Sequence, residues 1–227
     1  MMIEMMYITA VVVFALTAVV SVLIWLFYGY GMDKLKNPEE WSDKGRAGER
    51  AFWMALTKEI GVPEEQILRN VYIPIGGDKT SEIDLLVMSK KGIFVMECKN
   101  YGGNIYGDAR RKRWIQYAGN KKSYFYNPLM QNRVHCENLR KYLGEAGNVP
   151  IVSMVGTIKR GNWKVRGFRR GDYLLGYNCH FKDIYEAMGD SELMGKYWNV
   201  IMAKLKPLER PGDEIRQRHI DNAAHYK

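Results

Sequence analysis

Residues 83–100 read Ile-Asp-Leu-Leu-Val-Met-Ser-Lys-Lys-Gly-Ile-Phe-Val-Met-Glu-Cys-Lys-Asn, and this stretch decides the fold. Two apolar runs of strand length flank a Lys-Lys-Gly turn, which predicts a β-hairpin. Asp84 lies at the start of the first run, and Glu97 and Lys99 lie at the end of the second. Because side chains alternate along a strand, Glu97 and Lys99 are expected on one face with the apolar residues Ile93 and Val95. Carboxylates at the end of an apolar sheet are costly unless they pair with cations or hold a metal, so this hairpin is the candidate site.

The composition indicates one soluble domain with an appendage. The chain has 227 residues and a formal net charge of +9, a length that fits one ordinary domain. The basic excess indicates a polyanionic partner or an anionic membrane surface, and does not choose between them. The cysteines, Cys98, Cys136 and Cys179, are widely spaced, which argues against a disulfide framework and a zinc site. Reduced thiols are expected, with Cys98 a small buried hydrophobe on the strand face opposite Glu97.

Residues 1–32 are predicted to form a transmembrane anchor. No residue between Met5 and Met32 is charged, and about 20 apolar residues suffice to cross the hydrocarbon core. A cleaved signal peptide is the alternative, but it needs a basic start and a shorter apolar core, whereas this start carries Glu4 and no Lys or Arg. Basic residues follow the segment and none precedes it. The positive-inside rule therefore predicts a single-pass membrane protein with its N-terminus outside and its C-terminal domain in the cytoplasm.

The remaining sequence divides into a polar linker at 33–43, a domain at 44–206 and a frayed polar tail at 207–227. Hydrophobic periodicity and turn residues predict the elements of the domain. They are a helix at 44–60, a strand at 66–75, the hairpin at 83–100, an exposed hairpin at 104–117, a helix at 129–143, a strand at 149–158 and a helix at 182–205 interrupted near Gly189. A helix, three antiparallel strands, a helix and a strand in this order predict an α+β fold.

Short motifs on both sides of the hairpin occur together and in order. They are Gly45-x-x-Gly48-Glu49, Glu82-Ile83-Asp84, the run from Gly92 to Asn100, Gly103 with Gly107, and Asn127-Pro128-x-x-Gln131. Together with the Asp-x12-Glu-x-Lys spacing of Asp84, Glu97 and Lys99, they resemble the nuclease-related domain (NERD) family of the PD-(D/E)xK nuclease superfamily. The resemblance covers about Lys44 to Ile158. It implies a restriction-endonuclease-like core, in which helices flank a central mixed β-sheet.

That resemblance also implies an active site for metal-dependent phosphodiester hydrolysis. The catalytic residues would be Glu49, Asp84, Glu97, Lys99 and Gln131. Mg2+ or Mn2+ would be held by Asp84, Glu97 and the backbone carbonyl of Cys98, with Glu49 as an outer or second-metal ligand. Lys99, its pKa lowered by the metal and by burial, would orient or deprotonate water or neutralise the transition state, and Gln131 would hold the water or Lys99. The implied substrate is nucleic acid, with DNA favoured over RNA.

A non-catalytic function is the alternative to a nuclease. Asp84 with Lys99, or Glu97 with Arg46, could be ordinary ion pairs, and the domain would then tether nucleic acid or a protein to the membrane. His135, four residues after Gln131, is expected to be structural rather than catalytic.

Basic residues interleaved with aromatic ones are predicted to contact nucleic acid, because phosphates attract the charges and unpaired bases stack on the rings. The predicted contacts are Arg110, Arg111, Lys112, Arg113, Lys121 and Lys122, near Trp114 and Tyr124–Tyr126. Anionic lipid is a second partner that this charge would fit.

Overall fold

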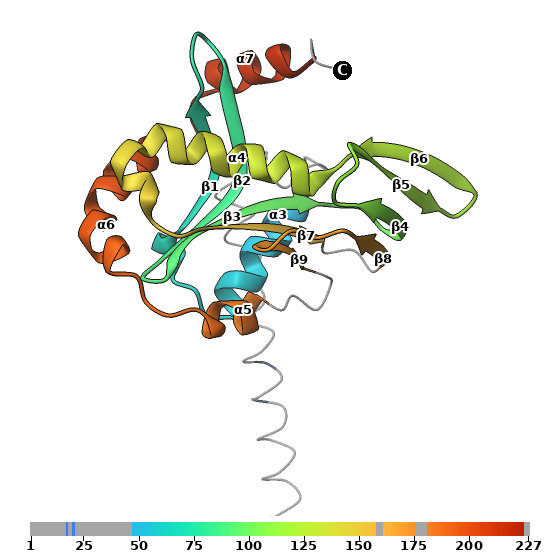
Figure 1. The fold of residues 1–227 in the computed structure, drawn as a ribbon, viewed down its shortest axis with the longest axis horizontal. Helices are drawn as coiled ribbons and strands as arrows, with labels where there is room; N and C mark the ends of the chain where they lie inside the picture. The colour runs from blue at the N-terminus through green and yellow to red at the C-terminus, as the bar shows by residue number, and fades with distance from the viewer. Residues whose placement is uncertain (1–16, 18–19, 21–46, 158–160, 176–180, 225–227) are drawn as a thin grey trace, which may run out of the picture. The chain divides into compact units, whose positions relative to one another are not determined.

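The computed structural model describes residues 17, 20, 47–157, 161–175 and 181–224 (Figure 1). Residues 48–227 form one compact unit, separate from residues 1–47. The predicted anchor at 1–32 and linker at 33–43 lie outside the described residues, apart from Thr17 and Val20, which are helical. Among the residues that are described, no helix has the length and apolar character needed to cross a membrane.

A five-stranded mixed sheet is the centre of the domain (Figure 1). Its strands are, in spatial order, β1 (Ile67–Pro74), β2 (Thr80–Ser89), β3 (Gly92–Lys99), β7 (Ile151–Thr157) and β9 (Asp172–Leu175). Strand β2 runs antiparallel to both β1 and β3, whereas β7 pairs with β3, and β9 with β7, in parallel. The predicted hairpin and the mixed α+β architecture are therefore confirmed.

Helices cover both faces of this sheet. One face packs on α4 (Pro128–Leu143) and α6 (Glu192–Leu205), and the other on α3 (Ala47–Met54), its π-helical continuation Ala55–Glu59, and α5 (Phe181–Ala187). Along β3, Ile93 and Val95 belong to the first core, while Phe94 and Met96 belong to the second. This alternation follows from the two-residue period of a strand, as the sequence predicts.

A second, four-stranded sheet extends from the domain (Figure 1). Its strands are β4 (Gly103–Asp108), β5 (Arg113–Ala118), β6 (Lys121–Tyr126) and β8 (Gly161–Arg166), in the order β6-β5-β4-β8. Ile105 and Trp114 on its inner face pack against Leu129 of α4 and Val155 of β7. The predicted exposed hairpin at 104–117 is thus only the middle of a larger sheet. Its outer strand β8 pairs in parallel with β4 from far along the chain, which no local pattern indicates.

The C-terminal region differs from the predicted tail. The predicted helix at 182–205 is interrupted as expected, since α5 ends at Ala187 and Ser191 caps α6. Beyond it, however, α7 (Asp213–Ala224) is a helix rather than a frayed segment. Its His219 contacts the Thr80 hydroxyl (Nδ1–Oγ1, 2.9 Å) and lies 3.5 Å from Glu82 on β2. Contact with the edge of the sheet therefore stabilises a helix whose polar sequence gives little intrinsic signal.

Candidate active site

Strands β2 and β3 separate at one end, and Asp84 lies where they part. Their ladder ends at the pair Leu85 and Met96. One residue further, the Asp84 carboxylate (Oδ2) accepts a hydrogen bond of 2.7 Å from the backbone N–H of Cys98. A side chain thus replaces the missing ladder bond, which holds the carboxylate beside the last residues of β3.

Glu97 is buried in a polar cluster between β3 and α4. Its Oε1 lies 2.5 Å from the Lys99 ammonium, and its Oε2 lies 3.3 Å from Nε2 of His135. Lys99 also donates to Oε1 of Gln131 at 3.2 Å. His135 contacts the Ser81 hydroxyl through Nδ1 at 2.8 Å. The structure therefore brings Glu97, Lys99 and Gln131 together as the sequence predicts, and it adds His135 as a residue that orients Glu97.

The start of α4 fixes where Gln131 and His135 point. The Asn127 side chain caps the helix by accepting hydrogen bonds from the N–H groups of Leu129 and Met130. Its amide also donates to the carbonyl of Arg111 at 2.8 Å, which ties the helix start to the second sheet. Gln131 and His135 are four residues apart and therefore lie on one helix face.

The buried Asn132 attaches α4 to the central sheet. Its Nδ2 lies within hydrogen-bond distance of the Val95 carbonyl (2.8 Å), the Ser153 hydroxyl (2.9 Å) and the Met154 carbonyl (3.0 Å). These contacts reach both β3 and β7, which fixes the distance and rotation of the helix that carries Gln131. Sequence reasoning did not identify Asn132. A polar residue at a core-facing helical position is the signal that could have done so.

Glu49 reaches the site from the first turn of α3 through a residue that the sequence did not indicate. Its Oε2 accepts a hydrogen bond of 2.7 Å from the side-chain amide of Asn70. Asn70 lies across from Asp84, because its neighbours Arg69 and Val71 pair with the neighbours of Asp84 on β2. The backbone of Asn70 has a φ of +49°. Asparagine tolerates this left-handed conformation better than most residues. The kink turns the Asn70 amide toward α3, so it links Glu49 to the sheet.

The pKa values of Asp84 and Glu97 shift in opposite directions. Burial and then repulsion by Glu97 and Glu49 raise the pKa of Asp84 well above its usual value. Burial also opposes ionisation of Glu97, but Lys99 and His135 outweigh it, so the pKa of Glu97 is lowered. For Lys99, burial is outweighed by Glu97, and its pKa is raised. The expected lowering of the Lys99 pKa is therefore wrong for the protein alone: Lys99 is an ammonium at neutral pH.

Comparison with known proteins agrees with this arrangement. A family model described as the nuclease-related domain, NERD, matches residues 44–158, about half of the chain, and this range contains all five predicted catalytic residues. The chain belongs to the NERD family. An uncharacterized protein of Bacillus anthracis is 35% identical over 119 residues, which are 52% of this chain and 54% of that protein. The NERD chain thus spans about half the length of this relative. No solved structure matches this chain.

The cysteine in the NERD hairpin is partly buried at the edge of the core. Cys98 packs with the α3 side of the central sheet, opposite Glu97, as predicted. Burial, followed by the neighbouring carboxylates, raises the pKa of the Cys98 thiol well above its usual value. Burial likewise raises the pKa of Cys136 to about 12. Both thiols are therefore protonated at neutral pH, and Cys179 lies outside the described residues.

The acidic residues of the NERD site do not form a dense metal cage. Across the described part of the chain, no three or more His, Cys, Asp or Glu side chains converge closely enough to hold a metal by themselves. Two carboxylates with waters are nevertheless a normal protein contribution to a Mg2+ site. Assignment of Asp84, Glu97, Glu49 and the Cys98 carbonyl as ligands stays a prediction.

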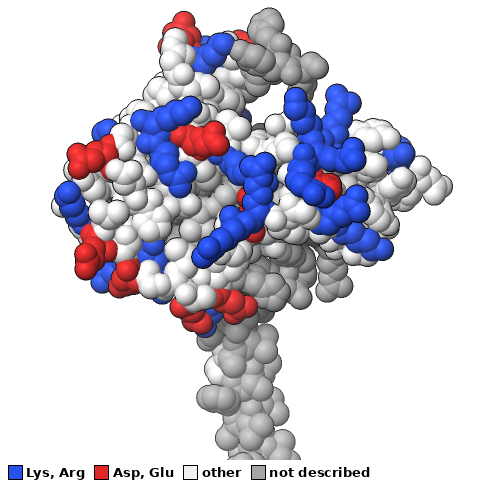
Figure 2. All heavy atoms as spheres, viewed as in Figure 1, with Lys and Arg blue, Asp and Glu red and all other residues white. Residues whose placement is uncertain are grey.

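The predicted basic contacts lie on or beside the second sheet, and they are not equivalent. Arg110 is held by Asp108 through side-chain contacts of 3.1 Å, and this hydrogen bonding lowers the pKa of the Asp108 carboxyl. Arg110 is nevertheless exposed, as are the other five, Arg111, Lys112, Arg113, Lys121 and Lys122. Figure 2 shows Lys and Arg side chains gathered on the side of the molecule where β4–β6 lie. Arg110 is thus paired within the sheet and still exposed, and all six residues stay predicted contacts to nucleic acid.

Proposed function

We propose that this NERD protein is a membrane-anchored, metal-dependent nuclease that hydrolyses phosphodiester bonds in nucleic acid, DNA rather than RNA. The observation that carries the proposal is the juxtaposition of Asp84, Glu97 and Lys99 where β2 and β3 part. Acidic side chains beside an ammonium group, at the end of an apolar sheet, are the groups that phosphodiester hydrolysis needs. The family assignment supports the same reaction class.

The charges of the site fit a divalent cation. Oε2 of Glu97 is buried and makes no aligned hydrogen bond in the protein. Asp84 is held near Glu97 and Glu49 although their negative charges repel it. Mg2+ or Mn2+ would relieve this repulsion, with Asp84, Glu97 and the Cys98 carbonyl as ligands and Glu49 as an outer residue. When bound, such an ion lowers the pKa of the attacking water and offsets charge on the phosphate.

The side chains around the carboxylates have separate roles in this proposal. Lys99, charged at neutral pH, stabilises negative charge that develops on the phosphate rather than removing a proton from water. Gln131 fixes the Lys99 ammonium by accepting its hydrogen bond. His135 restrains Glu97 through its 3.3 Å contact and is itself held by Ser81. Glu49, which Asn70 orients, adds negative charge behind Asp84.

A cleavage assay with matched variants tests the proposal. The full-length protein in detergent is incubated with radiolabelled DNA and Mg2+, and cleavage is compared for Asp84→Asn, Glu97→Gln and the exposed control Glu137→Gln on α4. We expect wild type and the control to cleave, with activity lost in EDTA and reduced at least 100-fold in the two site variants. Equal cleavage by Asp84→Asn, Glu97→Gln and wild type would overturn the assignment.

A non-catalytic tether is the second candidate, favoured by the exposed basic residues of the second sheet. In that case the wild type binds DNA in EDTA and does not cleave it with any divalent ion, and Asp84→Asn binds as well as wild type.

The membrane part of the proposal rests on the uncharged segment between Met5 and Met32. We propose that it crosses the membrane once, with the domain in the cytoplasm. Protease protection in inverted and right-side-out vesicles checks this orientation.

A further inference from the structure

We propose that the outer face of the second sheet is a binding platform for a single strand of nucleic acid. The inference rests on the proposed function and deepens it, because it names the form of substrate that the nuclease site receives. The platform is defined by outward-facing residues of β4, β5, β6 and β8. They are Tyr106, Arg113, Ile115, Tyr117, Lys122, Tyr124, Tyr126, Lys164 and Arg166.

Strand register assigns these residues to one face. Tyr106 pairs with Ile115 on one side and with Lys164 on the other, and Ile115 pairs with Tyr124. Paired residues on neighbouring strands share a face of the sheet. Their sequence neighbours turn to the opposite face, where Trp114 and Ile105 are buried in a core. The aromatic residues of this region therefore divide into buried structural ones and outward ones.

The outward tyrosines are exposed to an unusual degree. The exposed fractions are 40% for Tyr106, 38% for Tyr117, 57% for Tyr124 and 49% for Tyr126. Four exposed rings on one small sheet leave apolar area in water that a further element of the described domain does not cover. Such area marks a surface that meets a ligand.

Cations lie directly beside these rings. The Lys122 ammonium is 5.8 Å from the centroid of Tyr117 and 5.3 Å from that of Tyr124, and the Lys164 ammonium is 5.5 Å from that of Tyr106. This spacing places a positive charge within one side-chain length of three of the four tyrosine rings. A nucleotide needs this pair of contacts, since its base stacks on a ring while its phosphate meets a cation.

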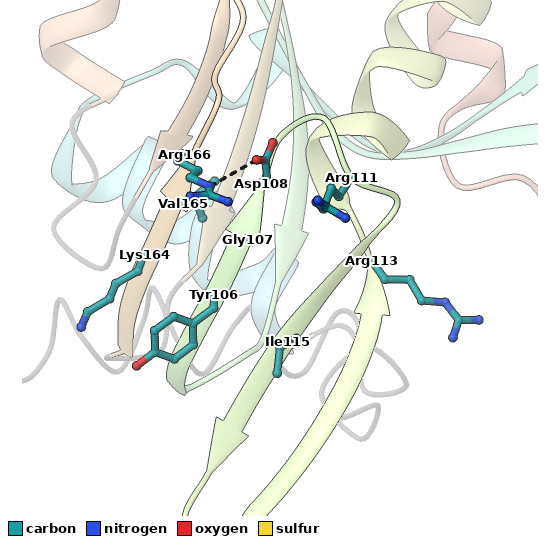
Figure 3. Close-up of a pocket in the computed structure, with 9 residues that line it drawn as sticks. All are labelled: Tyr106, Gly107, Asp108, Arg111, Arg113, Ile115, Lys164, Val165 and Arg166. Carbon is teal, nitrogen blue, oxygen red and sulfur yellow. Dashed lines mark hydrogen bonds and ion pairs between the residues drawn. The ribbon is translucent and has the colours of Figure 1, made fainter.

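A hollow of about 490 Å³ lies on the same face (Figure 3). In Figure 3, Tyr106 and Ile115 lie across from each other on adjacent strands, with Lys164 on one side and Arg113 on the other. The one carboxylate among its lining residues, Asp108, is paired with Arg166 at 3.2 Å. The hollow is thus positively charged around an apolar floor, which suits a base and its phosphates.

A single strand fits this surface better than a duplex. In a duplex the bases stack on one another and present only their edges, so rings on a flat sheet gain nothing from them. An unpaired strand can stack its bases on exposed aromatic rings, and each such contact is worth about 1–3 kcal/mol. A cationic surface without rings would suffice to bind a duplex through its phosphates. The four tyrosines are therefore the feature that selects a single strand.

The platform is joined to the nuclease site by a short connection. Strand β4 begins at Gly103, four residues after Lys99. An extended chain of four residues spans at most roughly 14 Å. The start of β4 therefore lies within roughly 14 Å of Lys99, so the platform begins close to the nuclease site along the chain.

Fluorescence anisotropy tests the platform without relying on cleavage. The full-length protein in detergent, in EDTA, is titrated against labelled 20-nucleotide oligothymidylate, the matching oligouridylate, and a duplex of the same length. We expect the single strands to bind at least ten-fold more tightly than the duplex. Tyr106→Leu and Tyr124→Leu should each weaken binding roughly ten-fold or more, whereas Tyr124→Phe, which keeps the ring, should bind like wild type.

Charge variants give an independent readout. Lys122→Gln together with Lys164→Gln should reduce the slope of log affinity against log salt by about 1.4. The control is Lys196→Gln on α6, because Lys196 lies 4.6 Å over the Tyr197 ring and thus has the same local chemistry away from the platform. This control should leave affinity and slope unchanged. Thermal unfolding of every variant checks that the surface substitutions leave the fold intact.

Several outcomes overturn the platform. They are equal affinity for duplex and single strand, unchanged affinity in both leucine variants, or no binding of nucleic acid combined with Tyr106- and Tyr124-dependent binding to phosphatidylserine vesicles. Equal affinity for the DNA and RNA strands would support the platform and show that it accepts both deoxyribose and ribose. The proposed nuclease fails separately: if Asp84→Asn binds the strand and still cleaves it, the platform stands and the active site does not.

Discussion

Replacing Asp84 by Asn should stabilise the metal-free protein, because it removes a charge that burial and two neighbouring carboxylates make unfavourable. The Asn side chain keeps an oxygen acceptor for the N–H of Cys98, which Asp84 binds at 2.7 Å. What it loses is the charge that burial, and then repulsion by Glu97 and Glu49, destabilises. Exchange of an unfavourable buried charge for a neutral residue of similar shape is worth about 1–2 kcal/mol in the free energy of unfolding. For a domain of this size that corresponds to a rise of roughly 3–6 °C in Tm.

The pH dependence has a definite sign. Because the pKa of Asp84 is raised in the folded protein, the carboxylate lowers stability increasingly as pH rises above its unfolded value of about 3.9. The penalty is complete only above the raised pKa. The stability gain of Asp84→Asn should therefore be near zero at pH 4 and grow toward neutral pH. Denaturant unfolding in EDTA at several pH values measures this difference.

Two comparisons complete the experiment. Asp84→Ala also removes the charge but leaves the N–H of Cys98 without its acceptor, so it should be about 1–3 kcal/mol less stable than Asp84→Asn. Mg2+ at ten times its Kd should stabilise the wild type by about 1.4 kcal/mol and the Asn variant much less. If Asp84→Asn is less stable than wild type at pH 8 in EDTA, the repulsion argument is wrong. Equal stabilisation of both proteins by Mg2+ would remove Asp84 from the metal site.

Three further predictions, one of them with a control substitution, probe the packing and the ion pair that support the site. Asn132→Ala should cost about 2–4 kcal/mol in the free energy of unfolding, because backbone carbonyls of two strands lose their donor, and chemical denaturation measures it. Gly156→Ala should lower the free energy of unfolding by about 1–3 kcal/mol, since the added Cβ would lie 2.1 Å from an aromatic ring of α3. The control Gly195→Ala, whose Cβ would have nothing within 4 Å, should be neutral or stabilising by up to about 1 kcal/mol. Equal effects of the two substitutions in thermal unfolding would refute the packing argument. Lys99→Met should destabilise by about 3 kcal/mol at pH 7 by leaving a buried carboxylate without its ammonium partner. Because the pKa of that carboxylate is lowered in the fold, this loss should shrink as pH falls below about 4, and urea titrations at pH 7 and pH 3.5 test it.

Local patterns were enough to predict much of the fold and part of the site. The hairpin of β2 and β3, the helix α4 and the strand β7 were predicted within a few residues of their observed bounds. Each has a periodic apolar pattern and a turn or capping residue at its end, so neighbouring residues determine it. The same alternation placed Glu97 and Lys99 on one strand face, toward α4, and the family motifs added Gln131.

The remaining features depend on contacts between distant segments. The sequence did not indicate that Asn70 adopts a positive φ and holds Glu49, or that the Ser81 hydroxyl positions His135. It predicted that a metal and burial lower the pKa of Lys99, whereas in the protein without metal the buried Glu97 raises it. Such effects depend on distances across the fold, which a residue's sequence neighbours do not set.

The sequence by itself determined where the candidate site lies: two carboxylates and an ammonium group at the ends of the strands of an apolar hairpin. The tertiary structure decided how they are arranged. The parting of β2 and β3 lets Asp84 bind the backbone of β3, and α4 adds His135 beside Glu97 and Gln131 beside Lys99. The tertiary structure also joined β8 to β4 and so collected tyrosines and cations from four strands on one face. Strand alternation is a local property, whereas parallel pairing of distant strands depends on the packing of the whole domain.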